Sequence, residues 1–363
     1  MKKVGKIAII ALSALLCALI VFTLVTFVIH SVKTDRELEA LKAGGFYNPV
    51  SVGDYSLNVA AFGKKDGEHT IVALAGLGMA DFAVSMRPMT ACLEENNLVV
   101  FVDRAGYGLS EDTGEDMTLD RIVEDYRHAL QNAGIEGPYV LMPHSIGGAY
   151  ATYWCSKYPE EIEAVAFVDG SQLDATAFEE ERDEYRTTFV NRVETLLCKL
   201  GFGRYVLRDY FYQYPDIYTE EEQYLGDALT VMSIDSWACL SECDFIADNV
   251  QSAFNSIVTN DVPKLYICAS WGYETEDDVT EYIAWMNRQR EINDLGDPIT
   301  VSSESIERLL TESCRMRETA LVPYLEKMGN CELVCLGGDH MIYEQKPEEC
   351  GRLIFDFINS LGE

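Results

Sequence analysis

The sequence carries one long uncharged apolar run, residues 7–29, close to its N-terminus. As a helix this run would span about 35 Å, which is enough to cross a hydrocarbon layer of roughly 30 Å. Secretory signals have a shorter apolar region followed by a small-residue cleavage site, and the segment 30–33 (His-Ser-Val-Lys) does not resemble one. We therefore expect an uncleaved transmembrane anchor over residues 7–29, with a cleaved signal as the alternative.

The charges that flank this run indicate its orientation. Lys2, Lys3 and Lys6 precede it, whereas Lys33 and Arg36 follow it. Because positive charge is retained on the cytoplasmic side, this modest bias favours a cytoplasmic N-terminus. We expect a single-pass protein of the cell membrane whose catalytic domain lies outside the cytoplasm.

Composition narrows the range of partners. The 363 residues include 28 Lys and Arg against 60 Asp and Glu, which gives a net charge of −32. Such an acidic chain is a poor match for a phosphate backbone, so we expect no nucleic-acid partner. Hydrophobic residues make up 48% of the chain, enough for a full core. The 11 cysteines are not spaced as a disulfide framework or a zinc site.

Beyond the apolar run, short apolar segments of buried-strand type alternate with helical spacing. One helix is expected over 118–133, beginning at the N-cap residue Thr118 and ending at Gly134. Alternation of this kind predicts an α/β fold with a mostly parallel sheet and helices on both faces. The expected strands are 70–75, 98–102, 139–142, 164–168, 264–269 and 331–336.

The remaining segments complete the expected organisation. Residues 30–46 are polar and are expected to form a helical stalk. Residues 174–262 lack a strand pattern and are rich in aromatics, including Tyr210, Phe211 and Tyr212, so we expect a helical cap or lid there. The core would then comprise residues 47–173 and 263–363.

Residues 139–148 (Tyr-Val-Leu-Met-Pro-His-Ser-Ile-Gly-Gly) predict a strand, a tight turn and a helix. A serine in such a turn is held outward at the end of the strand, in strained backbone geometry. Pro143 stands where the G-x-S-x-G pattern has its first glycine, while Gly147 keeps the last. Ser145 is therefore a candidate nucleophile, and a helix N-cap serine is the alternative interpretation.

Glycine-rich loops follow three other expected strands. They are residues 75–78 (Ala-Gly-Leu-Gly), 103–110 (Asp-Arg-Ala-Gly-Tyr-Gly-Leu-Ser) and 337–340 (Gly-Gly-Asp-His). Taken with the serine turn and the late histidine, these motifs resemble the α/β-hydrolase superfamily, and in particular membrane-anchored or secreted bacterial serine hydrolases. The resemblance runs from about residue 50 to residue 361.

The resemblance implies a catalytic triad. Ser145 would attack a carbonyl carbon, His340 would take up its proton, and a carboxylate would orient the imidazole. The superfamily often places that acid after the penultimate strand, but Gly272 falls at the matching position. Some relatives place it after the preceding strand, which here is Asp169. We favour Asp169, keep Glu274 and Glu276 as alternatives, and note that Asp169 could instead brace a loop.

The same resemblance implies an oxyanion hole made by the backbone N–H groups of Leu77 and Ile146, with the Gly78 N–H as the alternate donor. Two such donors would stabilise the tetrahedral intermediate. No dinucleotide or Walker motif occurs, and no His/Asp/Glu cluster suggests a metal, so we expect neither a cofactor nor a metal ion.

The leading hypothesis is a serine esterase, lipase-like, that acts on a carboxylic ester, with a preference for an apolar acyl group, through an acyl-enzyme. A proline-iminopeptidase-like amide hydrolase and an acyltransferase are alternatives within the same fold. A different class is an inactive hydrolase fold that serves as a binding module.

Overall fold

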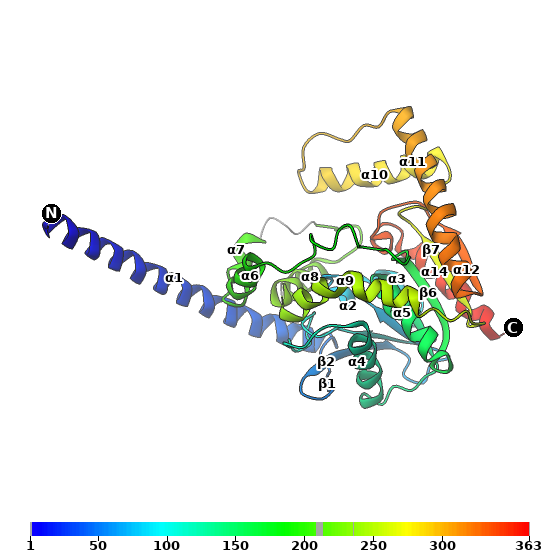
Figure 1. The fold of residues 1–363 in the computed structure, drawn as a ribbon, viewed down its shortest axis with the longest axis horizontal. Helices are drawn as coiled ribbons and strands as arrows, with labels where there is room; N and C mark the ends of the chain where they lie inside the picture. Colours follow the sequence, from blue (N-terminus) through cyan, green and yellow to red (C-terminus); the bar gives the residue numbers. More distant parts are fainter. Residues whose placement is uncertain (1, 208–212, 235, 363) are drawn as a thin grey trace.

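The computed structural model describes residues 2–207, 213–234 and 236–362, so Tyr210, Phe211 and Tyr212 lie outside the described residues. A sheet forms its centre (Figure 1). It has eight strands in the order β1-β2-β4-β3-β5-β6-β7-β8. The strands are β1 (Pro49–Ser51), β2 (Ser56–Gly63), β3 (Thr70–Leu74), β4 (Leu98–Val102), β5 (Tyr139–Ser145), β6 (Ile162–Gly170), β7 (Lys264–Cys268) and β8 (Cys331–Cys335).

Strand direction follows the predicted α/β pattern. In the part of the sheet ordered β4-β3-β5-β6-β7-β8, each strand is parallel to its neighbours. β2 pairs antiparallel with both β1 and β4. The six predicted parallel strands occur within a few residues of their expected bounds. β5 is buried along nearly its whole length, as an apolar strand at the middle of a sheet covered on both faces must be.

The helices connect the strands and cover the sheet. They are α1 (Lys2–Ala43), α2 (Phe82–Ser85), α3 (Arg87–Thr90), α4 (Leu119–Asn132), α5 (Gly147–Lys157), η1 (Pro159–Glu161), α6 (Phe189–Lys199), α7 (Gly203–Val206), α8 (Glu220–Ser233), α9 (Trp237–Asn255), α10 (Glu276–Ile292), α11 (Ser303–Met316), η2 (Arg317–Leu321), α12 (Val322–Met328), α13 (Ile342–Gln345), α14 (Pro347–Asn359) and η3 (Ser360–Gly362). As predicted, α4 begins after Thr118, whose side chain accepts a hydrogen bond from the Arg121 N–H.

Two apolar cores lie on opposite faces of the sheet. One face is covered by α4, α5, α9 and α12, and its core includes Trp154 and Tyr126. The other is covered by α2, α3, α8, α13 and α14, and includes Phe82 and Ile354. Buried apolar side chains on both faces confirm the predicted arrangement of helices around the sheet.

The expected insertion, residues 174–262, contains helices α6 to α9 in its described part. A second excursion leaves the sheet between β7 and β8, where α10 and α11 extend away from the rest of the molecule (Figure 1).

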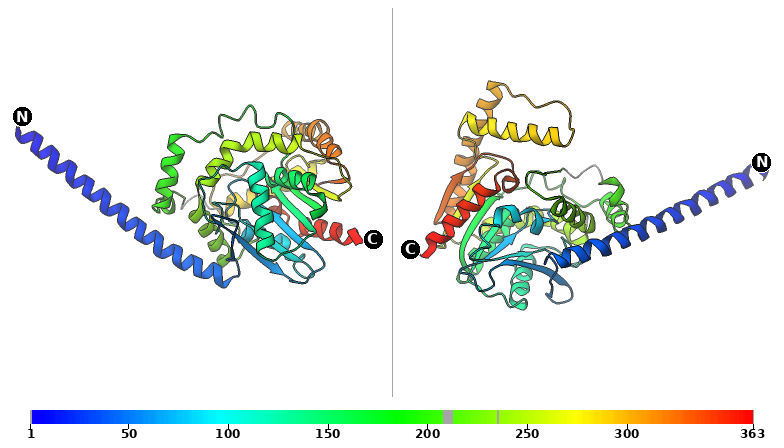
Figure 2. Two further views of the ribbon diagram at one scale, coloured as in Figure 1. Left: turned by 60° about the horizontal axis from the view of Figure 1, so that its bottom comes forward. Right: turned by 180° about the vertical axis from the view of Figure 1, so that it is seen from behind.

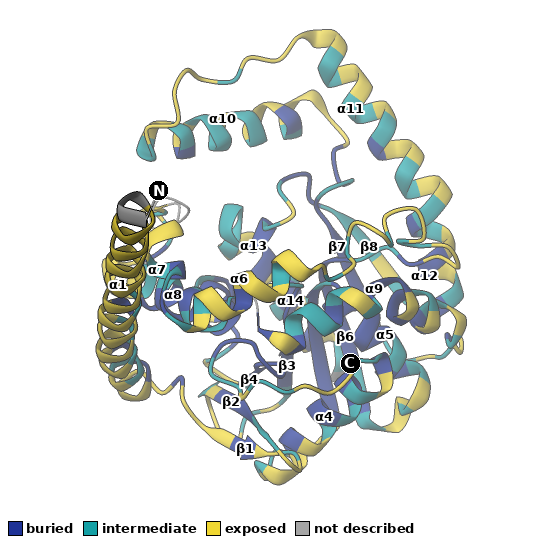
Figure 3. Cartoon of the chain, turned by 60° about the vertical axis from the view of Figure 1, so that its left-hand side comes forward, coloured by how far each residue is buried: buried dark blue, intermediate teal, exposed yellow. Residues whose placement is uncertain are grey.

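Helix α1 includes the apolar run, and among the described residues it is the one helix long and apolar enough to cross a membrane. Figure 3 shows it exposed over most of its length. It continues without a break through the expected stalk, where Glu37 and Leu41 are buried against the rest of the protein.

Candidate active site

Ser145 is the last residue of β5 and adopts a left-handed backbone conformation, with φ of 51°. An L-residue with a side chain rarely takes this conformation, so the turn is strained and projects the hydroxyl beyond the strand. Gly147 permits the turn, because a Cβ atom there would lie 2.4 Å from the Leu74 carbonyl oxygen. The serine is half-buried, whereas the residues around it are buried.

His340 lies beside Asp169. The His340 Nδ1–H donates to Asp169 Oδ2 over 2.7 Å, and this bond leaves Nε2 as the unprotonated nitrogen of the neutral ring. Burial lowers the pKa of His340, but the hydrogen bond and the negative charge of Asp169 outweigh it, so the net shift is upward. The carboxylate of Asp169 therefore orients the imidazole and raises its pKa, and the negative charge of Asp339 adds to the rise.

Asp169 is the penultimate residue of β6, the strand next to β5, and like Ser145 it has a positive φ, of 42°. Its side chain is buried, yet its charge is well solvated by protein donors. The Ala269 and Ser270 N–H groups donate to Oδ1 at 2.7 and 3.1 Å, and the Ser270 hydroxyl donates to Oδ2 at 2.5 Å. The residues after β7, where the superfamily often places the acid, thus supply donors to the Asp169 carboxylate.

The alternative acids lie elsewhere. Glu274 is 59% exposed in its side chain and approaches Arg317, with Oε1 3.8 Å from Nη2. Glu276 is exposed in the first turn of α10. Among the described residues, neither glutamate bonds to His340. The structure therefore brings Asp169, and neither glutamate, to the imidazole.

His144 has a supporting position next to Ser145. Its Nε2–H donates to the backbone carbonyl of His340 over 2.9 Å, and the two imidazole rings lie 4.7 Å apart. Burial and the nearby His340 charge lower the pKa of His144 to about 4, so the ring is neutral. His144 thus attaches the histidine loop to the serine turn, which brings the hydroxyl-bearing and imidazole-bearing segments to the same edge of the sheet.

Within the described part of the chain, Ser145 Oγ forms no hydrogen bond to His340. In structures without substrate such a bond is often long or poorly aligned, so this geometry does not exclude proton transfer.

The loop after β3 holds the backbone groups of Leu77. Arg104 Nη1 donates to the Ala75 carbonyl at 2.6 Å, and Nη2 donates to the Gly76 carbonyl at 2.7 Å. Because a trans peptide is planar, the Leu77 N–H points opposite to the Gly76 carbonyl and away from Arg104. Neither the Leu77 nor the Ile146 N–H donates to another group in the described residues. The Gly78 N–H, in contrast, donates to the Tyr107 hydroxyl over 3.2 Å.

Sequence reasoning placed these loops but missed the part of Arg104. In the sequence, residues 103–110 indicated a glycine-rich loop after a strand. The positive charge of Arg104 in a loop after a strand indicated a special role, but the partners of Arg104 are distant in the sequence and could not be identified from it.

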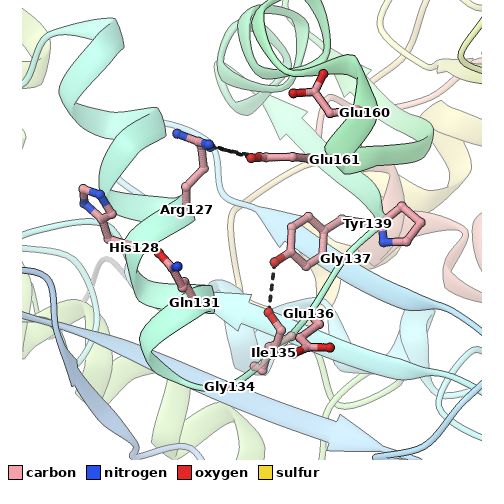
Figure 4. Close-up of a pocket in the computed structure, with 11 residues that line it drawn as sticks. Arg127, His128, Gln131, Gly134, Ile135, Glu136, Gly137, Tyr139, Glu160 and Glu161 are labelled. Atoms are coloured by element: carbon pink, nitrogen blue, oxygen red, sulfur yellow. Dashed lines mark hydrogen bonds and ion pairs between the residues drawn. The ribbon is translucent and has the colours of Figure 1, made fainter.

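A separate cavity of about 580 Å³ lies at the opposite end of β5 (Figure 4). It is lined by polar groups that include the Arg127–Glu161 ion pair and by Tyr139, the first residue of β5. Tyr139 and Ser145 are about 20 Å apart along an extended strand, so this cavity does not belong to the Ser145 site. Among the residues that the structure describes, no group of three His, Cys, Asp or Glu side chains is arranged to hold a metal ion.

Comparison with known proteins gives a consistent result. A family model for the alpha/beta hydrolase fold matches residues 75–202, from the loop after β3 through the serine turn and Asp169. The uncharacterized protein YbdG of Bacillus subtilis (strain 168) is 34% identical over 208 residues, covering 56% of this chain and 60% of YbdG. Another uncharacterized protein of that strain, YqjL, is 28% identical over 109 residues, covering 30% of this chain and 42% of YqjL. The chain thus matches less than two thirds of the length of either relative.

Solved structures share the fold at low identity. The epoxide hydrolase CorEH superposes with a TM-score of 0.58 at 16% identity, covering 87% of this chain and 99% of that one. The haloalkane dehalogenase DbeA of Bradyrhizobium elkani USDA94 gives 0.56 at 15%, covering 87% and 98%. A putative lipase of Acinetobacter baumannii AYE gives 0.54 at 16%, covering 92% and 96%.

Proposed function

Because this chain belongs to the α/β-hydrolase superfamily, we propose that it is a serine hydrolase that cleaves a carboxylic ester through an acyl-enzyme. The observation that carries the proposal is the hydrogen bond from His340 to Asp169 beside the strained turn of Ser145. Ser145 is the nucleophile, His340 the general base and Asp169 the residue that orients it.

The reaction follows from these positions. The Ser145 hydroxyl attacks the ester carbonyl carbon while His340 Nε2 accepts its proton. Asp169, which accepts from Nδ1, stabilises the imidazolium that forms. The imidazolium then protonates the leaving alcohol, which gives the acyl-enzyme. Water, deprotonated by the same Nε2, attacks the acyl carbon. The imidazolium then returns that proton to the Ser145 Oγ as the bond to the acyl group breaks, which releases the acid and restores the serine.

Negative charge develops on the carbonyl oxygen in both half-reactions. The N–H groups of Leu77 and Ile146 are the donors that we assign to it, because neither is used by another described group. One such donor contributes about 3–4 kcal/mol to the transition state in serine hydrolysis. Arg104 holds the Leu77 peptide in the orientation that this role needs.

We further propose that α1 crosses the cell membrane with residues 7–29 as a single-pass anchor, with the catalytic domain outside the cytoplasm. The described helices of the insertion, α6 to α9, act as a lid that favours an apolar acyl group. An apolar cover over the nucleophile would exclude water from the acyl chain.

A fluorophosphonate probe tests the nucleophile. The full chain in membranes should be labelled, and Ser145→Ala should not, while Ser252→Ala, on the exposed face of α9, should be labelled like the wild type. Equal labelling of Ser145→Ala would remove the assignment. A wild-type chain that is folded but unlabelled would favour a binding module.

A substrate panel tests the bond that is cleaved. Chromogenic esters of graded acyl length should be hydrolysed faster than aminoacyl anilides. Faster release of the anilides would instead support the amide hydrolase, and acyl transfer to added alcohols in preference to water would support the acyltransferase.

A further inference from the structure

Helices α6 and α7 carry large apolar side chains in exposed positions. The side chains of Phe189, Val190 and Leu196 on α6 are 81%, 60% and 54% exposed, and those of Tyr205 and Val206 on α7 are 51% and 75% exposed. The two helices contact each other. We call these five residues the apolar ridge. A water-soluble surface seldom gathers so much apolar area unless something covers it.

The ridge lies beside the apolar part of α1. The Phe22 ring is 5.9 Å from the Phe202 ring, just before α7, and stacks on the Tyr205 ring at 6.3 Å. Figures 1 and 2 show the end of α6 that leads into α7 close to α1. The close approach depends on Gly201, because a Cβ atom there would lie 2.4 Å from the Cβ atom of His30.

The position of Phe22 along α1 sets the depth of α7. Phe22 precedes Ile29, the last residue of the proposed span, by seven residues, or about 10 Å of helix. If α1 crosses the bilayer, the side chains that touch Phe22 lie about 10 Å inside its surface. Amphipathic helices that lie in a membrane interface are buried by roughly 5–10 Å, so α7 reaches a comparable depth.

A polar cluster fixes α7 to α1 just beyond the span. Arg204 donates to both carboxylate oxygens of Glu37, at 2.7 and 2.5 Å, and also to His30 and Thr34. The Arg204 and Glu37 side chains are largely buried. The contact is therefore built into the fold, and α7 cannot move away from α1 without breaking an ion pair.

We propose that the apolar ridge of α6 and α7 inserts into the lipid bilayer that α1 crosses, as a second membrane contact. The occupant of the ridge is phospholipid, since the ridge is continuous with a helix whose own exposed apolar face requires lipid. The inference rests on the proposed anchor and extends the proposed function: the proposed lid would face the bilayer, so apolar acyl substrates would arrive from the lipid.

Fluorescence quenching by lipid tests this placement in the full chain. The protein is reconstituted into phosphatidylcholine vesicles with or without bromine on the acyl chains, and Val206→Trp is compared with the wild type to isolate the added indole. Bromine should quench most of the added emission. Val258→Trp is the matched control, because Val258 is also exposed, at 61%, but lies between α9 and β7, which is one strand from the β8 edge of the sheet. Its added emission should be unaffected.

The outcomes separate the two proposals. A carbonate wash first tests the anchor alone. If the chain stays with the vesicles and bromine quenches neither Val206→Trp nor the second variant Phe189→Trp, the ridge inference is overturned and the anchor stands. The same holds if cross-linking shows the ridge covered by a second copy. If the wash removes the chain, the anchor fails, and the ridge inference fails with it.

Discussion

Arg104 and Glu242 form a buried ion pair, with Nε 3.1 Å from Oε2, that joins the loop after β4 to helix α9. The two side chains are 2% and 1% exposed. Burying two charges is costly unless further hydrogen bonds satisfy them. Here Arg104 also binds the Ala75 and Gly76 carbonyls, and the Tyr150 hydroxyl donates to Glu242. The pair thereby connects the insertion to the loop that carries Leu77.

Glu242→Gln should lower the free energy of unfolding by about 3 kcal/mol, because it leaves the Arg104 guanidinium buried without a counter-charge. Urea denaturation of the detergent-solubilised chain measures this. The matched control is Glu312→Gln, which breaks an exposed ion pair with Arg315 and should change stability by less than about 0.5 kcal/mol. The double variant Arg104→Met with Glu242→Met should lose less free energy of unfolding than the sum of the losses in the single variants Arg104→Met and Glu242→Met, because it leaves no unpaired charge.

Arg104→Lys should lower kcat by roughly 10²- to 10³-fold with little change in KM, because an ammonium group cannot hold both carbonyls and the Leu77 N–H loses its orientation. Steady-state kinetics on a soluble ester provide the measurement. A rise in KM with kcat unchanged would instead show that Arg104 contributes to binding of the substrate and not to stabilisation of the transition state.

Asp169→Asn should lower kcat by roughly 10³- to 10⁴-fold, since the amide would favour the wrong imidazole tautomer. Glu274→Gln should leave kcat close to that of the wild type, because Glu274 pairs with Arg317 and does not touch His340. The reverse result would transfer the acid role to Glu274.

The pH dependence of kcat/KM should report His340. The imidazole must be neutral to accept the serine proton, so activity falls as pH drops through its pKa. That pKa is held above 6.5 by Asp169, although burial opposes the shift. Asp169→Asn should therefore move the acid limb of the residual activity to lower pH. An acid limb that does not move would show that another group titrates there.

Stability should also depend on pH through Glu344. Burial raises its pKa from 4.5 to about 7, while the hydrogen bond from Tyr218 acts against the shift. A raised pKa means that the folded state holds the proton more tightly, so this contribution is full below pH 4.5 and is lost as pH rises through about 7. In the Glu344→Gln variant, the fall in the free energy of unfolding between low and high pH should be smaller by on the order of 2 kcal/mol. Glu348→Gln, at an exposed site, should leave that fall unchanged. Melting temperatures at pH 5 and pH 8 compare them.

Local sequence determined much of the fold. Short apolar runs predicted the parallel strands, because a strand covered on both faces must be apolar along its length. The serine turn, the late histidine loop and the helix beginning at Thr118 were readable for the same reason, since each depends on residues within a few positions of one another. The apolar run in α1 could also be recognised from the sequence, because its length depends only on consecutive residues.

The tertiary structure decided which distant groups meet. The sequence left Asp169, Glu274 and Glu276 open, and only the parallel order of β6, β7 and β8 brings Asp169, near the end of β6, to His340 in the loop after β8. The Arg104–Glu242 pair joins residues 138 positions apart, and the contact of Arg204 with Glu37 joins residues 167 apart. Such partners carry no local pattern, because their side chains become neighbours only after the sheet is assembled and the helices have packed against it.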